Sequence, residues 1–128
     1  MQVLIVEDQP NDLRIAIAAA QDSGFAAVEA RSSASAARDY LEKALEGKLS
    51  LPDAIVLDLD LGYESGFEIL RFWHSNPQLS KIPMLVWTIL GDQYREICNM
   101  FRVTAYLDKG ADGSALREAL GSVGRIAS

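Results

Sequence analysis

The chain has 128 residues, a length typical of one globular domain. Its hydrophobic fraction of 49% and charged fraction of 23% argue against a disordered protein. A net charge of −6, with no stripe of basic residues, disfavours binding to nucleic acid or to an anionic membrane. The single cysteine, Cys98, excludes an intramolecular disulfide and fits a reducing compartment.

We expect a cytoplasmic protein. A predicted strand begins almost at the N-terminus and leaves no room for a signal peptide. No apolar run approaches the roughly 18 residues of a transmembrane helix. We also expect residues 1–128 to form a single domain with no output domain in this chain.

The first half of the chain alternates strands and helices. Apolar runs bounded by turn residues predict the strands, and apolar stripes at helical spacing predict the helices. Proline in a first helical turn and glycine after a last turn mark helix ends. In chain order, these signals predict a strand over 2–7, a helix from Pro10 to Gly24, a strand over 26–30, a helix over 34–46 and a strand over 54–58.

The second half continues the alternation. Ser65 and Glu68 have the spacing of a capping box, which predicts the start of a helix that ends at Asn76-Pro77. The remaining elements are a strand over 84–88, a helix over 92–101, a strand at about 104–108 and a helix over 114–123. Five strand–helix units predict a parallel sheet with helices on both faces. At this length an open, doubly wound sheet is favoured over a barrel.

Four predicted strands end on polar side chains suited to phosphate chemistry. The carboxyl ends of parallel strands meet at one edge of the sheet, where ligands bind. Three acids, a hydroxyl and an amine should therefore gather there. The apolar runs lead into Glu7 and Asp8, into Asp58, into Thr88 and into Lys109.

The acids at this edge favour a metal site. Converging carboxylates repel one another unless a cation lies between them. Oxygen ligands and phosphate chemistry together suit Mg²⁺. Glu7, Asp8 and Asp58 are the expected carboxylate ligands, and Asp60 could add a backbone carbonyl. Alternatively, Glu7 and Asp8 are acids favoured by the dipole of the following helix.

Asp58 is either a solvated loop acid or a carboxylate nucleophile. Carboxylates accept phosphoryl groups to form aspartyl-phosphates. Phosphoryl transfer asks the protein mainly for positioning and charge neutralisation. The Lys109 ammonium, the Thr88 hydroxyl and a metal would supply both, although each residue alone could be ordinary.

The chain resembles the receiver domains of response regulators in bacterial two-component systems, the CheY-like family. The resemblance covers nearly all 128 residues, and its motifs are specific as a set. It implies a flavodoxin-like fold, a three-layer sandwich with strand order 2-1-3-4-5. The matching stretches are VLIVEDQP, IVLDLDLGYESGFEIL, IPMLVWT and AYLDK.

The resemblance implies a role for each site residue. Asp58 resembles the phosphoacceptor, and Thr88 and Lys109 resemble the phosphoryl contacts. Tyr106 stands where the family has its switch aromatic. The implied Mg²⁺ ligands are Glu7, Asp8, Asp58 and the main-chain carbonyl of Asp60.

The resemblance also implies a signalling mechanism. A sensor histidine kinase or phosphotransfer protein would donate the phosphoryl group to Asp58. Thr88 would move toward it, Tyr106 would turn inward, and the face of helix 4, strand 5 and helix 5 would change shape. That face would bind a downstream target or output domain, or form a homodimer. The domain would be no enzyme beyond its own phosphorylation and dephosphorylation.

Three residues depart from the family pattern. Gly110 follows Lys109 where a cis proline is usual, so we expect a trans Lys109–Gly110 bond, a looser loop over 110–113 and a less firmly held lysine. Ile89 replaces a small residue after Thr88, which predicts slow phosphorylation by small donors. Gly62 replaces a common proline and should only loosen its turn.

Two other functions compete with this interpretation. A pseudo-receiver would bind partners without phosphorylation, and only Gly110 and Ile89 favour it. A haloacid dehalogenase-type phosphatase would also use the pattern Leu57-Asp58-Leu59-Asp60. That motif normally opens its domain and needs an acid pair downstream, whereas Glu7 and Asp8 lie upstream.

Overall fold

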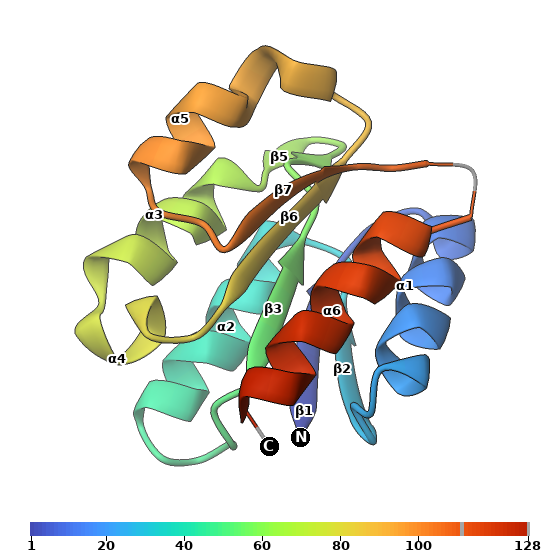
Figure 1. Ribbon diagram of the computed structural model, residues 1–128. Helices are drawn as coiled ribbons and strands as arrows, with labels where there is room; N and C mark the ends of the chain where they lie inside the picture. Colours follow the sequence, from blue (N-terminus) through green and yellow to red (C-terminus); the bar gives the residue numbers. More distant parts are fainter. Residues whose placement is uncertain (111, 128) are drawn as a thin grey trace.

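The computed structural model describes residues 1–110 and 112–127. A five-stranded parallel sheet runs through its centre, with helices on both faces (Figure 1). The order β2-β1-β3-β6-β7 is the predicted order 2-1-3-4-5, counted over the strands of this sheet. The flavodoxin-like fold is therefore confirmed. The strands are β1 (Gln2–Val6), β2 (Ala27–Arg31), β3 (Ala54–Leu57), β6 (Met84–Thr88) and β7 (Ala105–Asp108).

The helices divide between the two faces of the sheet (Figure 1). Two helices cover one face: α1 (Pro10–Asp22) and α6 (Ser114–Ala127). The opposite face carries α2 (Ala34–Leu45), α3 (Phe67–Ser75), the short α4 (Pro77–Ser80), the 3₁₀ turn η1 (Gly91–Tyr94) and α5 (Arg95–Met100).

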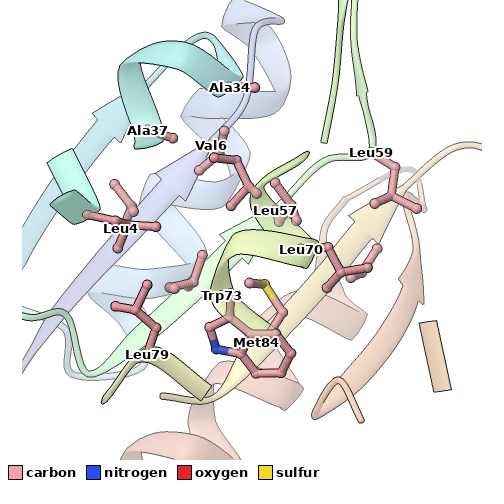
Figure 2. Packing of buried hydrophobic residues seen from close by; sticks show 14 of the residues in the cluster. Leu4, Val6, Ala34, Ala37, Leu57, Leu59, Leu70, Trp73, Leu79 and Met84 are labelled. Atoms are coloured by element: carbon pink, nitrogen blue, oxygen red, sulfur yellow. The ribbon is translucent and has the colours of Figure 1, made fainter. Parts of the chain in front are cut away.

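The sheet separates two apolar cores. The central strands β1, β3 and β6 are buried on both faces, as their continuous apolar sequences predict. Figure 2 shows the core under α2 and α3, where Trp73 packs close to Met84 and Leu70. The Trp73 indole is satisfied within this core, because its Nε1 donates a hydrogen bond to the Ile82 carbonyl at 3.0 Å.

The segment after the third strand differs from the prediction. It forms a two-stranded antiparallel hairpin of β4 (Asp60–Leu61) and β5 (Glu64–Ser65). The predicted capping box is wrong, since α3 begins at Phe67 and no side chain caps it. Ser65 Oγ instead accepts a hydrogen bond from Phe67 N at 3.2 Å. Hairpin pairing and the Gly66 N–H bond to the Leu59 carbonyl set this start.

Three smaller differences concern helices. The predicted helix over 92–101 is split into η1 and α5, because Tyr94 leaves the helical region with φ −111° and ψ 7°. The four-residue α4 follows Pro77 and was not predicted. The last helix extends past 123 to Ala127.

Residue 111, in the loop predicted to be loose, lies outside the described residues. No helix in the described part of the chain is long and apolar enough to cross a membrane.

Candidate functional site

Backbone hydrogen bonds continue past the ends of the strands and hold the site residues in register. The hydrogen bonds between two parallel strands are evenly spaced along the pair. The residue that follows one strand therefore lies beside the last residues of the neighbouring strand. The edge predicted from sequence is therefore formed by main-chain pairing. The bonds are Glu7 N to Arg31 O at 3.0 Å, Asp58 N to Val6 O at 3.1 Å and Lys109 N to Thr88 O at 2.9 Å.

Lys109 lies at the centre of this edge. Its Nζ is 2.7 Å from Glu7 Oε1, 2.8 Å from Asp12 Oδ2 and 2.8 Å from Asp58 Oδ2. The lysine side chain is only 5% exposed and lies over the Trp87 ring, with Nζ 5.1 Å from its centroid. The Lys109–Gly110 bond is trans, as predicted. These ion pairs hold the Lys109 ammonium at the acids, and the expectation that it is held less firmly than is usual in the family stays a prediction.

The charges at the site shift the proton affinities of two of its groups. Burial by itself lowers the pKa of Lys109, but hydrogen bonds to Asp12, Asp58 and Glu7 outweigh it and raise that pKa above its ordinary value. For Glu7, burial raises the pKa to about 7, opposed by the hydrogen bond from Lys109 and assisted by the charge of Asp58. Buried negative charge thus exceeds the one cation provided by Lys109.

The remaining acids fit a divalent cation. Glu7, Asp8 and Asp58 each offer a carboxylate oxygen, and these oxygens lie within 4.8 Å of one another. Asp8 Oδ1 is buried and has no hydrogen-bond partner. A buried, unpartnered carboxylate oxygen is costly unless a cation or water satisfies it. The donor set is the oxygen-only kind that Mg²⁺ and Mn²⁺ accept.

Asp58 lies at a cleft of about 230 Å³. The residue is 3% exposed, so a reacting group must reach its carboxylate through this cleft. Its Oδ1 accepts a hydrogen bond from Asp60 N at 3.0 Å, and its Oδ2 accepts one from Lys109. Both oxygens therefore have fixed directions. The lining residues are Asp8, Gln9, Asp12, Asp58, Asp60, Gly62, Ile89 and Lys109.

Gly66 allows the backbone to pass close to the acceptor strand. A Cβ at this position would lie 2.2 Å from the Asp58 carbonyl oxygen and 2.7 Å from Leu59 Cα. The φ of −62° and ψ of −18° suit any residue, so the close approach alone requires glycine. Sequence reasoning missed this role, although a glycine shortly after a strand-end acid was its visible signal.

Thr88 and Tyr106 lie farther along the same side of the sheet. Thr88 is fully buried at the end of β6, and its Oγ1 accepts a hydrogen bond from Leu90 N at 3.3 Å. Tyr106 in β7 is 6% exposed, and its hydroxyl donates to the Gly91 carbonyl at 2.5 Å. Arg95 stacks on the Tyr106 ring at 4.9 Å. The Tyr106 ring is thus largely buried in this structure.

Asp12 is a second site residue that the sequence did not reveal. It lies in the first turn of α1, where an acid is already explained by the helix dipole. Its partner Lys109 is 97 positions away. The only available signal was its place four residues after Asp8, one helical turn from the acid pair.

A doubly wound sheet with acids and a lysine at its carboxyl edge defines a small α/β domain with a cluster of carboxylates at that edge. The family model for the response regulator receiver domain matches residues 3–121. The chain therefore belongs to this family, a family of signalling domains in two-component systems. The receiver resemblance inferred from the motifs is confirmed.

Solved structures show the same fold. The phosphorylated cyanobacterial phytochrome response regulator RcpA is 26% identical, with a TM-score of 0.81 over 98% of this chain and 91% of that chain. The Mn²⁺-bound form of response regulator Rcp1 is also 26% identical, with a TM-score of 0.78 over 95% and 90%. The bacteriophytochrome response regulator RtBRR is 26% identical, with a TM-score of 0.80 over 96% and 77%. No curated protein sequence matches the chain.

Proposed function

We propose that this receiver domain accepts a phosphoryl group on Asp58 from a phosphohistidine of a sensor histidine kinase or phosphotransfer protein. An Asp58 carboxylate oxygen attacks phosphorus, the phosphorus–nitrogen bond breaks, and the imidazole leaves and takes up a proton. The observation that carries this proposal is the 2.8 Å ion pair between Lys109 Nζ and Asp58 Oδ2 beside the acid cluster. It supports the proposal, because a cation beside the acceptor would neutralise the charge of incoming phosphoryl oxygens.

Glu7, Asp8 and Asp58 would hold Mg²⁺, with the Asp60 main-chain carbonyl as a further ligand. When bound, such an ion supplies positive charge for the phosphoryl oxygens. The unpartnered Asp8 Oδ1 supports this assignment, as does the name of one structural relative as a Mn²⁺-bound form. The chain's own contribution is to orient Asp58, since Asp60 N and Lys109 Nζ each bind a different carboxylate oxygen.

Thr88 and Tyr106 would couple the acceptor to a partner-binding face. The face predicted as helix 4, strand 5 and helix 5 corresponds to η1–α5, β7 and α6. Within residues 1–110 and 112–127, the Thr88 hydroxyl makes one hydrogen bond, which its Oγ1 accepts from Leu90 N, so its own O–H would be able to donate to a phosphoryl dianion. Tyr106 bonds to the loop that carries Gly91, so a moving loop would carry the ring with it.

The partners follow from the family. We propose a kinase or phosphotransfer protein as donor and a downstream protein or output domain as target, with a homodimer through the same face as one form of output. Binding to nucleic acid or membrane is not part of the proposal, given the net charge of −6. A cytoplasmic location and a single-domain protein remain predictions. The ion pairs of Lys109 with Glu7 and Asp58 favour the phosphoacceptor over a pseudo-receiver.

Beryllofluoride with Mg²⁺ tests the acceptor assignment, because it binds receiver carboxylates as a phosphoryl mimic. Amide NMR should show shifts in wild type around Asp58, Thr88 and Tyr106 and none in Asp58→Ala. Tryptophan fluorescence gives a second readout, since the buried Trp87 ring lies against Lys109. An absent response in wild type, or an equal response in Asp58→Ala, would refute the proposal.

A further inference from the structure

Trp87 presents an aromatic face to the Lys109 ammonium. In the parallel pairing of β6 with β7, Trp87 stands opposite Leu107. Successive side chains alternate between the two faces of a sheet, so Lys109, two positions after Leu107, leaves the backbone on the same side as Trp87. The Lys109 Nζ lies 5.1 Å from the centroid of the Trp87 ring, within the range of a cation–π interaction.

Water has little access to this contact. Trp87 is 1% exposed, and the Lys109 side chain is 5% exposed. A cation–π interaction is strongest when the cation is desolvated, and tryptophan is the side chain that provides the best face for it. The ring belongs to the core between the sheet and helices α1 and α6, so its position is fixed by packing.

The indole nitrogen indicates that core packing alone does not explain this tryptophan. Among the described residues, Trp87 Nε1 is buried and has no hydrogen-bond partner, whereas Trp73 Nε1 in the other core donates to the Ile82 carbonyl. A buried donor without an acceptor lowers stability, and an aliphatic side chain would avoid that loss. The aromatic face toward Lys109 is the property that an aliphatic side chain would lack.

The attraction of the ring for Lys109 does not depend on the state of the acceptor. The Lys109 Nζ now pairs with Asp58 Oδ2 at 2.8 Å. A phosphoryl group on Asp58 would remove the charge of that carboxylate and bring new anionic oxygens beside it. The ammonium would then shift from the carboxylate to the phosphoryl oxygens. A neutral aromatic face attracts the cation before and after this shift.

We propose that Trp87 is a positioning residue whose ring holds the Lys109 ammonium at the acceptor while its anionic partner changes from carboxylate to phosphoryl group. The inference rests on the proposed acceptor role of Asp58. The residue after the lysine gives no comparable support, because no heavy atom among the described residues lies within 4 Å of the position that a Gly110 Cβ would take. Removal of the ring should therefore weaken the binding of a phosphoryl mimic.

The first test measures beryllofluoride affinity, with Mg²⁺ present, by amide NMR. Trp87→Leu keeps an apolar side chain but removes the aromatic face, and it should bind about tenfold more weakly than wild type. Trp87→Phe retains a smaller aromatic face and should lose no more than about threefold. Trp73→Leu is the matched control, since it removes a buried indole from the opposite core, and its affinity should stay within about twofold of wild type. Equal losses in Trp87→Leu and Trp87→Phe, or in Trp87→Leu and Trp73→Leu, would overturn the inference.

A second measurement leaves Trp87 in place. The chain has two tryptophans, so in a Trp73→Phe protein the fluorescence comes from Trp87 alone. Lys109→Met should change the emission maximum, because it removes a charge from the ring face. Lys81→Met removes an exposed lysine and should leave the emission unchanged. Unchanged emission in Lys109→Met would overturn the inference, even if Trp87→Leu did not fold.

A double-mutant cycle shows whether Trp87 acts through the lysine. In a Lys109→Met background, Trp87→Leu should lose most of its effect on beryllofluoride affinity. An equal effect in both backgrounds would assign Trp87 to packing alone and sink the inference. If wild type itself fails to respond to beryllofluoride, the proposed function falls together with this inference. A wild-type response that Trp87→Leu leaves unchanged removes the inference alone.

Discussion

Substitution of Gly66 tests how tightly helix α3 is packed against the acceptor strand. In Gly66→Ala the added Cβ would lie 2.2 Å from the Asp58 carbonyl oxygen and 3.0 Å from its carbonyl carbon. All of the nearest atoms belong to the backbone, so no rotamer change can relieve the contact. The backbone at residues 58–59 or the start of α3 must move apart by roughly 1 Å.

The expected cost follows from this geometry. Overpacking a core typically lowers the free energy of unfolding by 1–3 kcal/mol. Because the backbone atoms around Gly66 cannot rotate away, we expect a loss of about 3 kcal/mol or more for Gly66→Ala. For a domain of this size, that loss lowers the melting temperature by roughly 10 °C. The Gly66 N–H bond to the Leu59 carbonyl would be stretched by the same movement, which disturbs the backbone beside Asp58.

Urea unfolding monitored by circular dichroism measures the loss, with Gly110→Ala as the matched control. Gly110 has open space where a Cβ would be built, and no left-handed φ, so the same substitution there should change stability by less than about 0.5 kcal/mol. If Gly66→Ala proved as stable as Gly110→Ala, the close approach at the acceptor would be wrong. The unfolding slope m should be equal in both variants, which shows that they differ in stability and not in the surface exposed on unfolding.

Two further predictions concern Ile89 and Cys98. Ile89 is 68% exposed and lines the cleft to Asp58, so Ile89→Ala should speed labelling by acetyl phosphate several-fold, and an unchanged rate would contradict a steric role. Cys98 is fully buried, and burial raises the pKa of its thiol to about 11. Iodoacetamide should therefore alkylate it slowly at pH 8 in the folded protein and rapidly in urea, and fast labelling without urea would refute this. Because an unfolded thiol ionises near pH 8.5, this group lowers the stability of the fold as the pH rises from about 9 to 11.

The order of the elements was predictable because a strand that is buried on both faces of the sheet is a short, continuous run of apolar residues. A strand such as Ala54–Leu57 is apolar at every position, and the polar residue that follows it marks the sheet edge. The pairing register then brings Glu7 and Asp58 to the same height without further information. The β4–β5 hairpin was not predictable, since each of its strands has two residues and cannot show an alternating pattern.

The two missed site residues have a common physical origin. Gly66 matters through its distance to Asp58, and Asp12 matters through its ion pair with Lys109, while each looks ordinary among its sequence neighbours. Residues at strand ends can be predicted from the sequence because the backbone alone positions them. A residue that acts by close approach or by a long side chain is positioned by the packing of two elements. The sequence shows the glycine after Lys109, but it does not show which carboxylates from other elements pair with the ammonium.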